Sequence, residues 1–267
     1  MKRLILNADD FGLTDGVTTG IVDAIEKGIV TSTTAMVCVD GAAERLRRWG
    51  PRLPGRIGAH LQLTDGRPCL PVSEVPSLVG AEGRFPRSRR DVRTPAPEEV
   101  RREWEAQLER LRGFGIEPTH LDSHHHIHFE PTVFPVFLEV AKAHGLPVRS
   151  SRRFTRQLRE RGLACPDLGM TDWYGEPLTA SHFLEIVDAA FTSLRGEGTV
   201  ELMCHPGRAD PELAGLSSYV ADREGELAVL CSPEVKEGLT QRGVELVSMA
   251  ALRGDAARTE APLRERE

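Results

Sequence analysis

The sequence lacks the features that mark membrane-spanning, nucleic-acid-binding and disulfide-rich proteins. No apolar run is long enough to span a bilayer, and the basic residues of the opening MKRLILNADDF are followed too soon by an acidic pair for a secretory signal peptide. The formal net charge of −6 argues against a broad basic surface for nucleic acid. The 5 cysteines are scattered and show no CxxC spacing, so neither a disulfide framework nor a cysteine-rich zinc site is expected. We therefore expect a cytoplasmic protein with reduced thiols.

The sequence does contain a regular alternation of short apolar runs and amphipathic stretches. Its 267 residues and 40% hydrophobic content suffice for a sizeable core, and it shows no internal repeat. Alternating strands and helices favour βα units and a parallel sheet. About seven or eight strands fit a closed or nearly closed βα barrel better than an open sheet. The pattern predicts strands at 3–8, 33–39, 56–63, 119–123, 147–151, 199–204 and 243–249, and helices at 17–29, 41–49, 97–114, 133–144, 180–194 and 233–242.

Two stretches depart from this rhythm. Residues 65–97 are rich in proline and arginine, and a loop that long in a compact domain is usually functional or disordered. Residues 252–267 are charged and offer little to bury, which is typical of a flexible tail. We therefore expect one barrel domain over residues 1–251, with a long loop insertion around 65–97 and a tail at 252–267.

Polar side chains that can bind metals follow four of the predicted strands, at the point where each strand ends. Asp9 and Asp10 follow the first strand, and His60 lies at the end of the third. The fourth strand leads into the run SHHHIH, and His205 follows the sixth. Each has an ordinary explanation when taken alone, as a turn or cap residue or a hydrogen-bonded core histidine. Because strand ends converge on one mouth of an α/β barrel, their shared position indicates a site.

A bound cation explains this group of side chains. Two adjacent carboxylates at a buried strand end raise each other's pKa unless a cation lies between them. Neutral imidazoles are good ligands for Zn²⁺ and similar ions, which offsets the cost of burying several together. The strand period of two places Asp122, His124 and His126 on one face. Either histidine then suits the ligand position, and Asp122 suits a supporting role in which it accepts an imidazole N–H.

The same residue types indicate a hydrolytic reaction. One carboxylate and two histidines leave positions open for water and substrate, as a catalytic metal requires. A second carboxylate beside the ligands suits a general base, and an imidazole across the mouth suits a general acid. These groups together are those of metal-assisted hydrolysis.

Five motifs together resemble the YdjC-like family, which includes the chitooligosaccharide deacetylases and the hopanoid-associated deacetylases. They are LILNADDFG, GIVTSTTAMV, GAHLQLT, THLDSHHHIH and MCHPG, and they follow one another over essentially the whole predicted domain. The resemblance implies an α/β fold, a distorted βα barrel of the polysaccharide-deacetylase type with mostly parallel strands. It also implies an enzyme that removes an N-acetyl group from an amino sugar or short N-acetylated oligosaccharide and releases acetate.

The resemblance further implies roles for individual residues. Asp10, His60 and His124 take the positions of the ligands to one divalent metal ion, which is Zn²⁺ or Mg²⁺, with Mn²⁺ or Co²⁺ as alternatives. Asp9 takes the position of the catalytic base. His205, in the CHPG motif, takes the position of the general acid.

Other residues are candidates for supporting or substrate contacts. Asp122 and His126 are expected to support the ligands. Arg149, at another predicted strand end, pairs with the catalytic base or binds a sugar, and its alternative is a solvated surface arginine. Trp173 and Tyr174 either present an aromatic face to a sugar ring or pack as a plug.

Two rival functions fit parts of the pattern. A metal-dependent phosphoesterase on a similar barrel usually has a larger set of His and Asp residues and more than one metal. A non-catalytic sugar- or metal-binding protein has no need of a base beside the ligands. Residues 65–97 and 152–179 show no family pattern, and we expect them to cover the substrate. The expected partner is a small acetylated carbohydrate, and a homodimer is compatible with the sequence.

Overall fold

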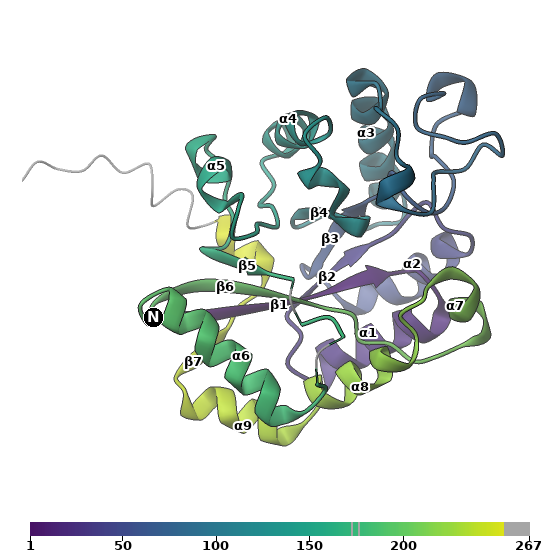
Figure 1. Ribbon diagram of the computed structural model, residues 1–267. Coiled ribbons are helices and arrows are strands. Elements are labelled where there is room, and N and C mark those ends of the chain that lie inside the picture. The colour runs from purple at the N-terminus through teal and green to yellow at the C-terminus, as the bar shows by residue number, and fades with distance from the viewer. Residues whose placement is uncertain (172, 176, 254–267) are drawn as a thin grey trace, which may run out of the picture.

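The computed structural model describes residues 1–171, 173–175 and 177–253. Its centre is a parallel sheet with the strand order β4-β3-β2-β1-β6-β5 and with β7 beside β1. Helices lie around this sheet, α3 and α4 near β3 and β4, α1 and α8 along β1, and α6 and α9 near β6 and β7 (Figure 1). The strands are β1 (Lys2–Phe11), β2 (Ser32–Ala35), β3 (Ile57–Leu61), β4 (Leu121–Ser123), β5 (Leu168–Met170), β6 (Gly198–Cys204) and β7 (Val244–Leu246). The α-helices are α1 (Asp15–Glu26), α2 (Ala42–Trp49), α3 (Pro97–Gly113), α4 (Phe134–His144), α5 (Thr155–Glu160), α6 (Ala180–Ser193), α7 (Pro211–Leu216), α8 (Ala221–Leu230) and α9 (Pro233–Gln241).

Strand β1 is central because both of its edges are paired. One edge pairs with β6 from Lys2 to Ala8. The other edge pairs with β7 from Lys2 to Leu4 and then with β2 from Asn7 to Phe11. The strand is buried from Leu4 onward. A strand covered on both faces has a nearly continuous apolar run, which is why LIL and not an alternating pattern predicted it.

The sheet curls, and the segment around Val148 connects its two end strands. Val148 forms a parallel bridge with Leu121 of β4, and its N–H donates to the Ala164 carbonyl at 2.9 Å, shortly before β5. The Ser150 hydroxyl donates to the Pro166 carbonyl on the same side, at 3.3 Å. These contacts confirm the prediction of a distorted βα barrel with parallel strands.

Several predicted strands are longer than the strands that form. The predicted strand at 33–39 ends at Ala35, and the one at 147–151 is only the bridge at Val148. Met36 to Val39 stay buried although they have left the sheet. An apolar run therefore indicates a buried segment, which is either a paired strand or irregular backbone in the core. Strand β5 and helices α5, α7 and α8 are elements that the pattern did not predict.

The long segment 65–97 is packed against the domain. It contains two 3₁₀ turns, Val72–Glu74 and Arg89–Asp91, and otherwise irregular backbone. Val75 and Phe85 are buried. The segment therefore forms a wall over one side of the sheet's carboxyl end, where it is able to shape a site.

The end of the described chain is also attached to the domain. Leu252 is buried in a small cluster with Ile5 and Met249. Arg253 donates a hydrogen bond to the Pro118 carbonyl at 3.0 Å. The rest of the predicted tail, residues 254–267, lies outside the described residues.

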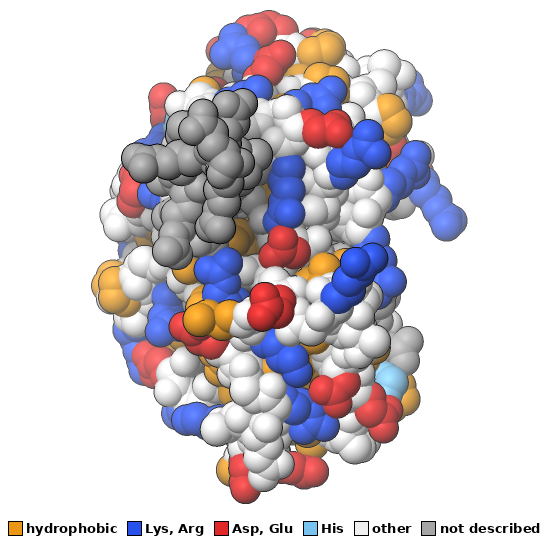
Figure 2. Space-filling model, turned by 90° about the vertical axis from the view of Figure 1, so that its left-hand side faces the viewer, with side chains coloured by type: hydrophobic (Ala, Val, Ile, Leu, Met, Phe, Trp, Pro, Cys, Tyr) orange, Lys and Arg blue, Asp and Glu red, His pale blue; other side chains and the backbone are white. Residues whose placement is uncertain are grey.

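The surface has a mixed charge pattern on the face drawn in Figure 2. There, Lys and Arg side chains alternate with Asp and Glu, and hydrophobic atoms occur in small groups between them. Within the described ranges, no helix combines the length and the apolar character needed to cross a membrane.

Candidate metal centre and active site

Asp10 is placed by a bulge at the carboxyl end of β1. The register between β1 and β2 shifts between Ala8 and Phe11, and Asp10 has a φ of 70°. The left-handed region costs a non-glycine residue about 1–2 kcal/mol, although aspartate tolerates it better than most residues. The bulge breaks the alternation of the strand, so Asp9 and Asp10 are both buried and each meets its own set of partners.

Two histidine side chains from separate strand ends face one oxygen of Asp10. His60 Nε2, from β3, lies 3.5 Å from Asp10 Oδ1, and His124 Nδ1, directly after β4, lies 3.3 Å from the same oxygen. The ligand atoms of these residues all lie within 4.8 Å of one another. Asp10 Oδ1 is buried without a hydrogen-bond partner among the described residues. A buried anionic oxygen facing two ring nitrogens is what a divalent cation would satisfy, so the residues fit a metal ion.

The second oxygen of Asp10 is held by Arg223 on helix α8. Arg223 Nη2 donates to Asp10 Oδ2 at 2.6 Å, and its Nε donates to the Tyr219 carbonyl at 2.9 Å. Burial by itself would raise the pKa of Asp10, but Arg223 holds that pKa well below its usual range. Arg223 thus keeps Asp10 ionised and turns Oδ1 toward the histidines. Sequence reasoning did not find Arg223, because α8 was not predicted and an arginine on a helix usually faces solvent.

His60 is oriented by Asp122 of β4. Its Nδ1 lies 2.6 Å from Asp122 Oδ1, and Thr34 donates to Asp122 Oδ2 at 3.0 Å. An ionised carboxylate only accepts, so the ring proton is on Nδ1 and the Nε2 lone pair faces Asp10. The structure therefore brings Asp122 to the place that the strand period indicated for it.

His124 lies between two carboxylates. Its Nδ1 faces Asp10, and its Nε2 is 3.1 Å from Oδ2 of Asp65, the first residue of the long segment. Burial by itself would lower the pKa of His124, but Asp10 and Asp65 raise it to about 9. A metal at Nδ1 would take the place of the proton that these anions attract. Asp65 is a second site residue that was not predicted from the sequence. Its position directly after the GAHLQLT motif could have indicated it.

Asp9 is clamped by Arg149. The Nη1 and Nη2 atoms of Arg149 donate to Asp9 Oδ2 and Oδ1, both at 2.6 Å, and Asn7 donates to Oδ1 at 2.9 Å. Burial by itself would raise the pKa of Asp9, but Arg149 holds it well below its usual range. Arg149 also lies 2.8 Å from Asp122 and 2.8 Å from Glu201 of β6. With 1% of its surface exposed, Arg149 is a buried centre of charge and does not lie on the solvated surface.

Glu201 is a third residue that the sequence reading passed over. It stands inside the buried strand β6, where its Oε1 accepts from Arg149 Nε. Burial raises the pKa of Glu201 to about 7, so near neutrality it is partly protonated. One guanidinium therefore does not have to balance three full negative charges. A glutamate within the apolar run TVELMC was the signal that could have found it.

His205 follows β6 and faces an aromatic wall. Its ring lies edge-on to Tyr174 and Tyr219, with centroids 5.5 and 5.8 Å away. Its Nδ1 is buried without a partner among the described residues, and its backbone N–H donates to Glu226 of α8. Burial lowers the pKa of His205 to about 4, so the imidazole is neutral at pH 7.

The two neighbouring aromatic residues have different environments. Trp173 is fully buried and packs edge-on against Phe183, so it is a packing residue. Tyr174 is 50% exposed and stacks on Tyr219 at 4.2 Å. Only Tyr174 presents a face to the cavity beside the metal ligands.

The histidine run separates into different environments because the strand ends at Ser123. Residues His124–Phe129 form a 3₁₀ turn in which His125 and His126 have positive φ angles of 53° and 52°. The expectation that His126 shares a strand face with His124 was therefore wrong, since the period of two no longer holds beyond β4. His125 is exposed and stacks on His124 at 3.9 Å.

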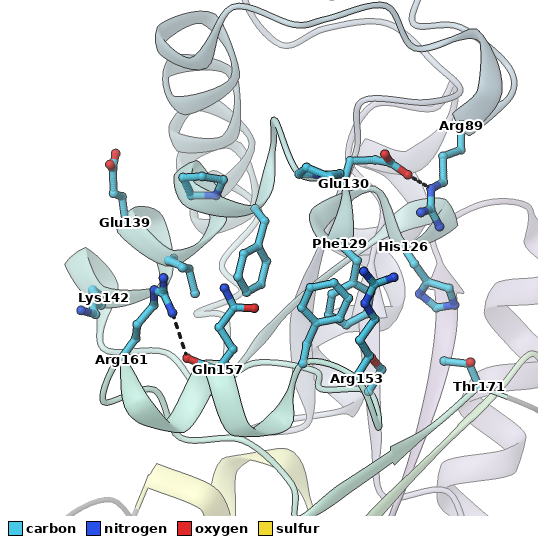
Figure 3. A pocket seen from close by; sticks show the side chains of 16 residues that line it. Arg89, His126, Phe129, Glu130, Glu139, Lys142, Arg153, Gln157, Arg161 and Thr171 are labelled. Atoms are coloured by element: carbon cyan, nitrogen blue, oxygen red, sulfur yellow. Dashed lines mark hydrogen bonds and ion pairs between the residues drawn. The ribbon is translucent and has the colours of Figure 1, made fainter.

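His126 lines a second cavity. This cavity of about 960 Å³ lies between α4 and α5. Figure 3 shows His126 and Thr171 at one end of it and Lys142 and Arg161 at the other, with Phe129 between them. Burial lowers the pKa of His126 to about 3, so its ring is neutral. The two other histidines of the run, His120 and His128, are buried and hydrogen-bonded to Asn7 and Ser123 respectively.

A smaller cavity opens directly from the metal ligands. It measures about 560 Å³, and its lining includes Asp10, His124, Tyr174 and Arg223. Residues of the long segment, Asp65 among them, form its wall. A curled parallel barrel with an Asp-His-His group, an adjacent ionised carboxylate and this cavity has the form of a metal-dependent hydrolase.

Comparisons with known proteins agree with this description. A family model described as YdjC-like protein matches residues 3–241. A carbohydrate deacetylase of Geobacillus stearothermophilus is 42% identical over 92% of this chain and 96% of its own. A chitooligosaccharide deacetylase of Yersinia pestis strain Pestoides F is 39% identical over 92% of this chain and 98% of its own. A solved structure from Enterococcus faecalis V583, named for cellobiose-phosphate cleavage, has a TM-score of 0.84 at 36% identity and covers 94% of this chain and 98% of its own. The chain belongs to the YdjC-like family.

Proposed function

We propose that this chain is a metal-dependent carbohydrate deacetylase, which removes an N-acetyl group from an amino sugar or short N-acetylated oligosaccharide and releases acetate. The observation that carries the proposal is Oδ1 of Asp10, which has no hydrogen-bond partner among the residues that the structure describes and faces ring nitrogens of His60 and His124. The substrate class is supported by the names of two relatives that align over 92% of the chain.

Asp10, His60 and His124 would hold one divalent ion. Two imidazoles and one carboxylate suit Zn²⁺, and Mg²⁺, Mn²⁺ and Co²⁺ are the other candidates. When bound, such an ion supplies Lewis acidity, which lowers the pKa of a water molecule and polarises an acyl carbonyl.

Asp9 accepts the proton of the attacking water. Its ionised state at neutral pH follows from the two hydrogen bonds that Arg149 donates to it. Arg149 also contacts Asp122, which orients His60. One guanidinium therefore sets the position of the base relative to a metal ligand, and this rigid placement is what general base catalysis requires.

His205 donates a proton to the amine nitrogen as the C–N bond breaks. The imidazole follows β6 directly, on the other side of β1 in the sheet from the strands that precede or carry His60 and His124. Burial lowers the pKa of His205 to about 4, so the imidazole takes up a proton during the reaction before it acts as the acid, and the anionic Asp10 and Asp9 offset part of the effect of burial.

The acetylated sugar occupies the cavity of about 560 Å³ beside the ligands. The exposed face of Tyr174 suits the apolar face of a sugar ring. Five free cysteines support a cytoplasmic location, where thiols stay reduced. A homodimer is part of the same proposal and is tested by light scattering.

An acetate-release screen tests the function. Protein without a His-tag is stripped of metal and given Zn²⁺, Mg²⁺, Mn²⁺ or Co²⁺ singly, with N-acetylglucosamine, chitobiose and longer oligomers as substrates. We expect release with at least one ion and none from the His60→Ala variant, while His125→Ala serves as the control that still binds the ion.

Two other results would contradict the proposal. Clearly more than one ion per chain together with release of phosphate from a sugar phosphate would indicate a phosphoesterase. No acetate from any N-acetylated substrate, with an Asp9→Asn change that alters only affinity, would indicate a binding protein.

A further inference from the structure

Two cysteines far apart in the sequence lie side by side beneath the long segment. Cys38 follows β2 and is buried, and Cys69 is half-buried near the start of the segment 65–97. Their Sγ atoms are 3.8 Å apart although 31 positions separate them. A disulfide needs about 2.05 Å between the sulfurs, so a shift of roughly 2 Å would join them.

The backbone around both cysteines is held in place by hydrogen bonds. The Arg67 N–H donates to the Cys38 carbonyl at 2.8 Å, and the Cys38 N–H donates to Gln62 Oε1 at 3.0 Å. The Cys69 N–H donates to Glu103 Oε1, on helix α3, at 2.9 Å. The short distance between the sulfurs therefore comes from a fixed local fold.

The two thiols have unequal chemistry. The two thiols lie within hydrogen-bond distance, so Cys38 can donate to a Cys69 thiolate, and Arg110 Nη1 lies 3.6 Å from Cys69 Sγ. The bond from Cys38 and the Arg110 charge lower the pKa of Cys69 despite its burial. Burial raises the pKa of Cys38 well above its usual range. Cys69 is thus the more exposed and more acidic thiol, and Cys38 is its buried neighbour.

We propose that Cys38 and Cys69 form a reversible disulfide when the protein meets hydrogen peroxide. The Cys69 thiolate attacks the O–O bond, so that a sulfenic acid forms and hydroxide leaves. The Cys38 sulfur then attacks the Cys69 sulfur, the S–O bond breaks, and the departing hydroxide takes a proton to become water. Glu103 Oε1, 4.0 Å from Cys38 Sγ, is placed to receive the Cys38 proton first. Overall, two thiols lose two hydrogens and the peroxide becomes two waters.

The bond would join two walls of the cavity beside the metal ligands. Val39 and Asp40, directly after Cys38, line that cavity, and so do Asp65 and Gly66, shortly before Cys69. Oxidation would therefore tie the base of the covering segment to the carboxyl end of β2. Thiol oxidation is measured without an assay of deacetylation, so its test does not depend on the proposed function.

Cys38, Cys69 and Glu103 together could also bind a soft metal ion. Their surroundings disfavour this alternative. Glu103 Oε1 already accepts from the Cys69 N–H and from Gln107, and its Oε2 accepts from the Leu70 N–H at 3.1 Å. The raised pKa of Cys38 opposes a second thiolate at this place. These groups favour a dithiol that exchanges with a disulfide.

The test uses the full-length reduced protein and hydrogen peroxide at a stoichiometric dose. Free thiols are then blocked with N-ethylmaleimide, and the digest is analysed by mass spectrometry. We expect a Cys38–Cys69 linked peptide, lighter by two hydrogens than the two thiol peptides together and lost on reduction. Cys231→Ser, which removes another half-buried cysteine, is the matched control and should form the same linkage.

Two further variants separate the steps. Cys38→Ser should stop at the sulfenic acid, which dimedone traps on Cys69. In that background, Arg110→Gln should slow alkylation of Cys69 severalfold at neutral pH and move its pH profile to higher pH. The proposal is overturned if peroxide leaves both thiols open to maleimide while Cys231 is oxidised. It is also overturned if Cys69 in the unmodified sequence goes directly to sulfinic acid, or if zinc alone binds tightly to the two thiols and blocks both reagents.

Discussion

Arg149 holds Asp9 through both carboxylate oxygens, at 2.6 Å each, although 140 positions separate them in the chain. The guanidinium is 1% exposed and also contacts Asp122 and Glu201. A planar fork that is always charged matches several carboxylates at once, which lysine cannot do. This pair therefore links the proposed base to the strand that orients a metal ligand.

We expect Arg149→Gln to destabilise the protein and abolish turnover. Removing one partner of a buried ion pair leaves uncompensated charge, which costs about 3–5 kcal/mol in the free energy of unfolding. Urea unfolding followed by circular dichroism measures the loss. Arg156→Gln breaks an exposed pair with Glu160 and serves as the control, for which no measurable change is expected. Equal stabilities of the two variants would show that Arg149 has no such role.

We expect Asp122→Asn to weaken metal binding while the fold is kept. The asparagine removes the negative charge from the group that accepts the His60 Nδ1–H, and losing such a partner typically costs about 10- to 100-fold in metal affinity. Calorimetric titration of the metal-free protein measures the change. His125→Ala is the control and should titrate as the unmodified protein does. If His125→Ala loses the ion instead, the ligand assignment within the histidine run is wrong.

We expect Asp9→Asn to retain the metal ion and lose most activity. The change keeps the size of the side chain but removes the group that accepts the proton from water, which contributes about 10²- to 10⁴-fold to rate. Metal content by mass spectrometry and acetate release together separate the two effects. An Asp9→Asn variant with near-normal acetate release would assign the base elsewhere.

We expect Glu226→Gln to remove part of the pH dependence of stability. Burial raises the pKa of Glu226 from 4.5 to about 7. Because this pKa is higher in the folded than in the unfolded state, Glu226 contributes to the free energy of unfolding at low pH. The contribution is complete below pH 4.5 and is lost as the pH rises through 7. Glutamine resembles the protonated form and does not titrate. The free energy of unfolding of the variant, relative to that of the unmodified protein, should therefore be about 3 kcal/mol higher at pH 8 than at pH 4.5. Unfolding curves at both pH values measure this, and parallel pH profiles would contradict it.

We expect Gly169→Ala to disturb the closure of the sheet. A Cβ on Gly169 in β5 would lie 2.0 Å from the Ser150 carbonyl oxygen, which is backbone and has no rotamer to change. Overpacking of this kind costs about 1–3 kcal/mol in the free energy of unfolding. Gly113→Ala, in a helix with open space around it, is the matched control and should be neutral or stabilising by up to about 1 kcal/mol. A similar thermal midpoint for both variants would count against this packing argument.

The strand ends that carry Asp10, His60 and His205 were predictable from the sequence. Each residue follows or completes a buried apolar run. The carboxyl ends of parallel strands meet at one mouth of the barrel, and this does not depend on the conformation of the loops. Asp122 was predictable for the same reason, because it lies within the regular part of β4, where the period of two still applies. The barrel itself follows from the alternation of strand and helix patterns.

The tertiary structure decided what lies beyond those regular elements. Asp65 reaches His124 from an irregular segment, and Arg223 reaches Asp10 from a helix over 200 positions away. No local pattern encodes such contacts, because they depend on how loops and helices close over the sheet. His126 shows the same limit within a single motif, since the positive φ angles of His125 and His126 end the strand alternation and His126 lines another cavity. Periodicity therefore determines which strands bring the ligands together, whereas charge compensation and loop closure determine which of their neighbours complete the site.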